Sequence, residues 1–193
     1  MTKPIVLASA SPRRKELLKN LGLTFTVDRA EATEILNIGL KPAELAKSIS
    51  LRKAQAAASR HADSIIIAAD TFGVLDGVIL GKPVDARHAS KMLAELSGRR
   101  HSVITGFTVI DSTTGRIVSR SVETRVYFRK LSRSEIGRYV KSGEPLDKAG
   151  AYAIQGLGAL LVEKIEGDYY NVIGLPLCAL AGVLKTFGIA LPA

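Results

Sequence analysis

The chain has 193 residues, of which 47% are hydrophobic and 23% charged, and this composition excludes a largely disordered chain. Its 27 lysines and arginines outnumber the 18 acidic residues and give a net charge of +9. Such a balance suits a nucleic acid, a membrane surface or a small phosphorylated substrate as partner, and it equally suits a solvated basic surface. The apolar stretches are shorter than the roughly 20 residues that cross a bilayer, and the first residues lack a signal-peptide pattern, so we expect a cytoplasmic protein without a membrane partner.

The first half of the chain predicts strands that alternate with helices. Ser11 is a good N-cap and Pro12 suits the first helical position, so a helix begins there and Gly22 ends it. The continuously apolar run SIIIAA is typical of a strand covered on both faces. The sequence predicts a strand over residues 4–9 and a helix over 11–20. Residues 23–41 are predicted to hold a short strand near Phe25 and then an acidic loop. An alanine-rich helix over 42–59, opened by Pro42, and a third strand over 64–69 follow.

The second half adds hairpins to this pattern. Asp76-Gly77 between apolar runs is a strong hairpin signal, and Ser132 with Glu135 forms a capping box at the start of a helix. Further predicted elements are a helix from Asp85 to Gly98, a long hairpin of 101–111 with 116–128, the capped helix to about Gly143, a strand pair of 159–165 with 168–173, and a last helix from Pro176 to Gly188. Together they predict an α/β fold, one domain over residues 1–193 with a mixed, twisted central sheet and flanking helices.

The single cysteine, Cys178, lies in the apolar pattern of the last helix and has no metal-ligand spacing around it. We therefore expect it to be buried as a small hydrophobic residue. Its isolation also fits a reducing cytoplasm.

The stretch LASASPRR places Arg13 and Arg14 in the first turn of a helix. A helix N-terminus is electropositive, so cations there normally cost a few tenths to about 1 kcal/mol. The Ser9 hydroxyl, the guanidinium groups and the backbone N–H donors of that turn all suit phosphate oxygens. We interpret the stretch as an anion site, against the alternative of a surface helix start with solvated arginines.

Two further loops carry polar side chains that packing does not explain. Asp70-Thr71 follows the strand predicted for the apolar run SIIIAA. A carboxylate in that position is costly unless it is paired, bound to a metal or used in chemistry. On the turn that neighbours this loop, Lys82 lies between Gly81 and Pro83 and is either a charge for phosphate or a solvated loop residue. The glycine-rich segment 147–158 indicates close approach of another group to its backbone, and the Gln155 amide there suits a base edge or another polar group.

Several common chemistries are absent from the sequence. Gly77, Gly81 and Lys82 have the wrong spacing for a P-loop, and the scattered histidines fit no zinc pattern. Aromatic residues make up only 5% of the chain and tryptophan is missing, which disfavours a stacking platform for single-stranded nucleic acid.

Four stretches, in order and at family spacing, resemble the Maf family of nucleoside triphosphate pyrophosphatases: LASASPRRKELL, AADTFGVLDGVILGKPVD, LSGRRHSVITG and DKAGAYAIQGLGALLVEKIEGDYYNVIGLPL. The resemblance runs from about Ile5 to the last helix. It implies a mixed α/β fold similar to that of inosine triphosphate pyrophosphatases. It also implies that the protein is cytoplasmic and forms a homodimer. It also implies hydrolysis of a nucleoside triphosphate to the monophosphate and pyrophosphate with a divalent cation, Mg²⁺ or Mn²⁺.

The resemblance also implies roles for individual residues. Asp70 matches the catalytic carboxylate, as general base or as metal ligand. Positions tied to substrate choice match Arg13, Thr71 and Gln155, and the polar pocket lining matches Ser9, Arg14, Lys53 and Lys82. Glu34 aligns with an acidic pocket residue that would share the metal or act as the base, although this chain has Thr33-Glu34 where the family often has two adjacent acids.

Within the family, ADT together with AYxIQG resembles the subgroup that acts on dTTP and UTP, whereas the sibling subgroup, similar to 7-methyl-GTP hydrolases, usually reads Ser-Asp-Gln. A second hypothesis comes from a different class: a nucleic-acid- or partner-binding regulator of septum formation that performs no catalysis. The two differ in what they predict, because a nucleic-acid binder loses affinity steeply with salt and an enzyme releases pyrophosphate.

Overall fold

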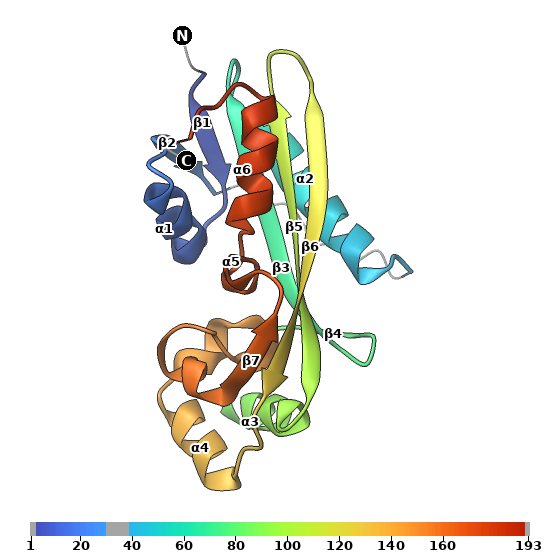
Figure 1. The fold of residues 1–193 in the computed structure, drawn as a ribbon, viewed down its shortest axis with the longest axis vertical. Coiled ribbons are helices and arrows are strands. Elements are labelled where there is room, and N and C mark those ends of the chain that lie inside the picture. The colour runs from blue at the N-terminus through green and yellow to red at the C-terminus, as the bar shows by residue number, and fades with distance from the viewer. Residues whose placement is uncertain (1–2, 30–38, 192–193) are drawn as a thin grey trace. The chain divides into compact units, whose positions relative to one another are not determined.

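The computed structural model describes residues 3–29 and 39–191, which divide between two compact units (Figure 1). The first unit consists of Met1–Asp70, Thr105–Val122 and Gly174–Ala193, and the second of Thr71–Ile104 and Glu123–Ile173. The chain first passes from one unit to the other inside a continuous strand, between Asp70 and Thr71. The expectation of one domain over residues 1–193 stays a prediction.

A mixed sheet of seven strands runs through the described residues in the order β2-β1-β3-β5-β6-β7, with β4 paired to β3. In the first unit β1 pairs in parallel with both β2 and β3, so that Ile5 lies opposite Phe25 and Ile65. The mixed α/β sheet with flanking helices is therefore as predicted. The strands are β1 (Ile5–Ala8), β2 (Phe25–Asp28), β3 (Ile65–Leu75), β4 (Val78–Leu80), β5 (Arg100–Asp111), β6 (Ile117–Phe128) and β7 (Val162–Glu166).

The first unit carries the helices α1 (Pro12–Asn20), α2 (Pro42–Ala58) and α6 (Leu177–Thr186), which begin where the sequence predicts. The side chain of Ser11 caps α1, and Gly22, at a φ of 72°, follows its end. Helices α2 and α6 cover opposite faces of the sheet (Figure 1). Small residues of α2, Ala54 and Ala57, pack on Ile66 and Ala68 of β3, which lets the helix lie close to the strands.

The closest approach of α2 to the sheet occurs at Gly106 of β5. A Cβ atom on Gly106 would lie 2.1 Å from the carbonyl carbon of Ala46 and 2.6 Å from the amide nitrogen of Lys47. Both are backbone atoms of α2, so no side-chain rotation relieves the overlap, and glycine alone permits this contact. Lys53 follows Ala46 by two helical turns and lies on the same face of α2. The position of α2 at Gly106 therefore also affects the position of Lys53.

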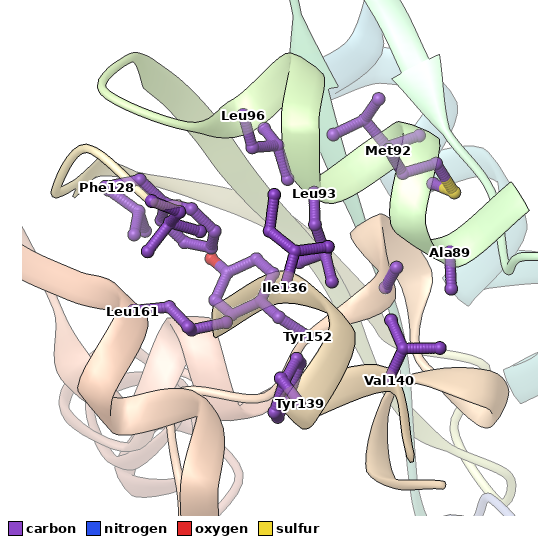
Figure 2. Close-up of a cluster of buried hydrophobic side chains, with 14 of the residues drawn as sticks. Ala89, Met92, Leu93, Leu96, Phe128, Ile136, Tyr139, Val140, Tyr152 and Leu161 are labelled. Carbon is purple, nitrogen blue, oxygen red and sulfur yellow. The ribbon is translucent and has the colours of Figure 1, made fainter. Parts of the chain in front are cut away.

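The second unit is built around an apolar core (Figure 2). Helix α3 (Ala86–Leu96) contributes Met92, Leu93 and Leu96, and α4 (Arg133–Lys141) contributes Ile136, Tyr139 and Val140. The hairpin between β3 and β4 turns at Asp76-Gly77, and the predicted capping box opens α4. The rest of the unit consists of the 3₁₀ helices η1 (Glu144–Asp147), η2 (Ala149–Ala151) and η3 (Gly156–Leu161) and the short helix α5 (Tyr169–Ile173).

The strand predicted over residues 168–173 is wrong, because Tyr169–Ile173 form α5. The Asp168 carboxylate accepts hydrogen bonds from the backbone N–H groups of Tyr170, at 2.7 Å, and Asn171, at 3.2 Å, and thereby starts a helical turn. Strand β7 pairs with β6 instead, in antiparallel fashion. The first three residues of the predicted strand 159–165 belong to η3.

The expectation that Cys178 is buried is also wrong, because its side chain is exposed on α6. The buried residues of α6 are Leu177, Leu180, Val183 and Leu184, and Cys178 falls one position outside that face. Like the other helices among the described residues, α6 is not long and apolar enough to cross a membrane.

A buried histidine, His101, packs against the apolar core of the second unit. His101 is 3% exposed, and its ring makes edge contacts with Phe128 and Tyr152, at centroid distances of 5.2 Å and 5.4 Å. Its Nε2 lies 2.8 Å from the Tyr152 hydroxyl, and its Nδ1 has no hydrogen-bond partner among the described residues. Burial lowers the pKa of His101 from 6.5 to about 4, so the folded protein holds the neutral imidazole.

The pKa of His101 predicts a loss of stability in acid. The unfolded chain takes up a proton near pH 6.5 and the folded chain only near pH 4, so this contribution is present above pH 6.5 and lost as the pH falls toward 4. The full difference corresponds to about 3 kcal/mol. Urea unfolding at pH 7 and pH 4.5 should show a smaller acid loss for His101→Gln than for the wild type, whereas His88→Gln keeps the wild-type loss. Equal losses in all three proteins would refute this role of His101.

Candidate active site

Asp70 and Lys53 form a partly buried ion pair in the first unit. Lys53 comes from α2 and Asp70 from β3, and the distance from Nζ to Oδ1 is 2.5 Å. The two side chains are only 16% and 15% exposed. A carboxylate in such surroundings needs a compensating charge, which the ammonium group supplies.

The sequence suggested that Asp70 follows the end of a strand, but in the structure Asp70 lies within β3. The strand runs on for five residues after it, to Leu75. The burial pattern changes at this position, because the five preceding residues are all buried whereas Asp70 and Thr71 are half-buried. Asp70 therefore marks the point at which the strand leaves the fully covered part of the first unit.

Arg14 is held rigidly in the first turn of α1. Its Nε donates to the carbonyl oxygen of Gly174 at 2.8 Å, and its Nη1 donates to the Ser9 hydroxyl at 3.2 Å. The same hydroxyl accepts a hydrogen bond from the Ser11 backbone N–H at 3.2 Å. The guanidinium plane of Arg14 is thus fixed by a nearby hydroxyl, that of Ser9, and by a carbonyl group distant in the chain, that of Gly174.

Electrostatics link this turn to Asp70. Burial lowers the pKa of the Arg14 guanidinium, the negative charge of Asp70 opposes that shift, and the positive charge of Arg13 adds to it. An arginine stays protonated under all such conditions, so the first unit holds a fixed cluster of positive charge around one carboxylate. Rigid guanidinium and ammonium groups, together with hydroxyls and helix N–H donors, are groups that suit phosphate oxygens.

The structure brings four of the predicted site residues into this cluster, with Arg13 beside them: Ser9, Arg14, Lys53 and Asp70. Three others, Thr71, Lys82 and Gln155, belong to the second unit. Glu34 lies outside the described residues.

Within the second unit, the turn with Lys82 and the segment before Gln155 are neighbours. The Gly150 backbone N–H donates to the carbonyl oxygen of Gly81 at 3.0 Å. Gly150 adopts a φ of 75°, and Lys82 and Gln155 are both exposed. Two of the three predicted site residues in this unit, Lys82 and Gln155, are therefore presented by backbone segments that are hydrogen-bonded to each other.

Asp70 is the one predicted metal ligand among the described residues. They contain no group of three or more His, Cys, Asp or Glu side chains suited to a metal ion. Mg²⁺ is often bound through one or two carboxylates plus substrate phosphates, and the Asp70 carboxylate is a group suited to that mode.

Sequence reasoning assigned no role to three features of the structure: the contact at Gly106, the buried His101, and a hydrogen-bonded pair of Tyr139 with Glu144. Gly106 did carry a signal, since an isolated glycine within a β-branched run indicates close backbone approach. The other two depend on residues that are distant in the chain or separated by a turn, and no local pattern marks them.

Comparisons with known proteins find similarity over nearly the whole chain. The family described as Maf-like protein matches residues 4–187. A dTTP/UTP pyrophosphatase of Pelotomaculum thermopropionicum is 49% identical over 96% of this chain and 97% of its own. Proteins of the same name from Moorella thermoacetica and Dictyoglomus turgidum are 49% and 48% identical, over 96% and 99% of this chain and 95% and 100% of their own.

Proposed function

The chain belongs to the Maf family, and we propose that it is a hydrolase that converts dTTP and UTP to the nucleoside monophosphate and pyrophosphate. The three relatives at 48–49% identity are named for that activity, and the similarity covers almost their whole length. The observation that carries the proposal is the Lys53–Asp70 pair beside the fixed guanidinium group of Arg14. None of the three relatives has a name that indicates a binding-only regulator.

Charge explains how the first unit captures the substrate. A triphosphate carries several negative charges, which must be offset when it leaves water. Arg13, Arg14 and Lys53 supply positive charge, and the N-terminal turn of α1 adds backbone N–H donors. The two arginines in that turn, unfavourable by themselves, are then explained by the anion that they bind.

The reaction requires water to attack the α-phosphorus. A new bond forms between the water oxygen and that phosphorus, the bond to the bridging oxygen breaks, and pyrophosphate leaves with the electron pair. Asp70 either accepts the proton that the water loses or holds the divalent cation, and the structure is compatible with both roles. A Mg²⁺ or Mn²⁺ ion bound by Asp70, with Glu34 as the second expected ligand, would supply positive charge against the phosphates.

The proposal extends to substrate choice, location and assembly. Thr71 and Gln155 are the residues that we expect to distinguish pyrimidine nucleotides from others, and modified pyrimidine nucleotides are included in that class. We also propose a cytoplasmic homodimer, without nucleic acid as a partner.

A small nucleotide panel tests the proposed function. The purified protein is assayed for pyrophosphate release from UTP, dTTP, CTP and GTP, with Mg²⁺ or Mn²⁺ and with a chelator. We expect metal-dependent release that is greatest with UTP and dTTP. Affinity for DNA or RNA that falls steeply with salt, without pyrophosphate release from any nucleotide, would instead support the regulator.

Replacing Arg13 with Ala should weaken substrate capture and leave the fold intact. The side chain is half-buried at the second position of α1 and adds to the positive charge at Arg14. Loss of one charge-assisted contact corresponds to about a tenfold rise in the KM for UTP. Steady-state kinetics with UTP measure this change.

Arg133→Ala is the matched control, because Arg133 is an exposed first-turn arginine of α4 in the other unit. Its KM should equal that of the wild type. An Arg13→Ala protein with unchanged KM and kcat would contradict the anion site at α1.

A further inference from the structure

The loop that carries Gln155 is built against one carboxylate, that of Glu144. Its Oε1 accepts a hydrogen bond from the Gly158 backbone N–H at 2.9 Å, and its Oε2 accepts one from the Leu157 N–H at 3.1 Å. These N–H groups open η3, where a helix has no backbone acceptor for them. Glu144 therefore holds the chain directly after Gln155.

The same carboxylate is tied to the core through Tyr139. The Tyr139 hydroxyl donates to Oε1 of Glu144 at 2.9 Å and accepts from the Ala153 N–H at 3.3 Å. The Tyr139 side chain is 5% exposed and lies in the core of α3 and α4 (Figure 2). One buried phenol and one carboxylate thus hold the backbone on both sides of Gln155.

Two glycines allow the loop to close around this pair. A Cβ atom on Gly156, which has a φ of 72°, would lie 2.7 Å from Oε2 of Glu144. A Cβ atom on Gly158 would lie 2.1 Å from the carbonyl oxygen of Ala153 and 2.8 Å from the Tyr139 hydroxyl. The loop therefore fits the Tyr139–Glu144 pair without space for a side chain at either glycine.

The charge state of Glu144 suits this contact. Burial alone would raise its pKa, but the hydrogen bonds from Gly158, Tyr139 and Leu157 outweigh that effect and hold the pKa of Glu144 below its ordinary value. The carboxylate is therefore ionised at neutral pH, in the form that accepts all three hydrogen bonds.

We propose that Glu144 is a positioning residue for nucleotide selection, which fixes the backbone on both sides of Gln155 and so fixes where the Gln155 amide meets the base. This inference rests on the proposed function, in which Gln155 contacts the nucleobase. An amide offers one acceptor and one donor, which match the N3–H and O4 of uracil or thymine, whereas cytosine presents the reverse pattern. A fixed backbone limits the positions from which the amide can reach a base, and a loose loop lets the amide adjust to either base.

Glu144→Gln tests the inference, with Glu135→Gln as the matched control. Glu135 is also a carboxylate of the second unit that accepts hydrogen bonds from a backbone N–H and a hydroxyl, both of Ser132, at 2.8 Å and 2.7 Å. We expect Glu144→Gln to lower the ratio of kcat/KM for UTP over CTP about tenfold, chiefly through the KM for UTP. Hydrogen exchange at Leu157 and Gly158 should also become faster. Glu135→Gln should change neither quantity.

A double-mutant cycle establishes whether Glu144 acts through Gln155. In a Gln155→Ala background, Glu144→Gln should leave the UTP-to-CTP ratio unchanged. The inference is overturned if Glu144→Gln keeps the wild-type ratio, or if it shifts the ratio equally in both backgrounds. Should Glu144→Gln fail to fold, Tyr139→Phe removes only the shared hydroxyl, and the same two readouts must then shift in the same direction.

Failure of the proposed function has a separate signature. It would appear as a wild-type protein that releases no pyrophosphate from UTP or dTTP. The hydrogen-exchange comparison of the Glu144→Gln and Glu135→Gln proteins needs no activity. Unchanged exchange at Leu157 and Gly158 would overturn the role of Glu144 as the anchor of the loop.

Discussion

Replacing Asp70 with Asn is expected to lower the turnover of UTP by about 100-fold or more, the scale on which a general base or a charged ligand contributes. Asn keeps the shape of Asp but can neither accept a proton nor offset the Lys53 ammonium group at 2.5 Å. Initial rates of pyrophosphate release at saturating UTP measure the effect. The unfolding free energy of the variant shows whether the protein is folded under the assay conditions.

The matched control is Asp111→Asn. Asp111 lies in the same unit, is similarly covered with 14% of its side chain exposed, and pairs with Lys3 at 2.7 Å. Its replacement removes a comparable ion pair that the proposed chemistry does not use, so turnover should stay close to that of the wild type. An Asp70→Asn enzyme with near-normal turnover would remove Asp70 from the mechanism.

Gly106→Ala is expected to destabilise the fold by about 3 kcal/mol or more, at the upper end of overpacking effects. The added Cβ would lie 2.1 Å from a backbone atom of α2, so the helix itself must move. Because α2 carries Lys53, the movement should also disturb the Lys53–Asp70 pair and lower kcat in the protein that still folds. Urea unfolding and steady-state kinetics measure the two effects.

Gly137→Ala provides the comparison for this variant. Gly137 lies inside α4, and a Cβ atom there would meet nothing within 4 Å. The change should therefore stabilise the protein, by about 0.5–1 kcal/mol, because alanine loses less entropy in a helix. Wild-type stability and turnover in Gly106→Ala would show that α2 is not positioned by this contact.

Features set by neighbouring residues could be predicted from the sequence. Ser11 with Pro12 located the start of α1, Asp76-Gly77 located the first hairpin, and Ser132 with Glu135 located the start of α4. In each case a side chain or a φ preference acts on backbone groups a few residues away, so no knowledge of the fold is needed.

The errors arose where packing decides between local options. Residues 168–173 have the aromatic and β-branched content of a strand, yet the Asp168 carboxylate and the buried Asn171 side chain select a helical turn. The predicted burial of Cys178 was wrong because Cys178 lies next to Leu177, which is buried, but outside the buried face of α6.

The candidate site shows the same division. Sequence alone suggested an anion at Arg13 and Arg14 and a functional role for Asp70, because those side chains were unfavourable in their predicted places. The approach of Lys53 to Asp70 followed only from the resemblance to the family, since the pair joins a helix to a strand. The support of Gln155 by Tyr139 and Glu144 was not foreseen, because its hydrogen bonds run between side chains and the backbone of a folded loop.

The proposed function requires that the cations of the first unit bind the polyphosphate beside Asp70. A crystal structure of the protein with Mg²⁺ and α,β-imido-dUTP, whose bond between the α- and β-phosphates resists hydrolysis, tests it most directly. We expect phosphate oxygens within hydrogen-bond distance of Arg14 and Lys53, with the α-phosphorus as the phosphorus atom nearest to the Asp70 carboxylate. Phosphates bound away from both cations, with Asp70 still paired to Lys53 and remote from the nucleotide, would contradict it.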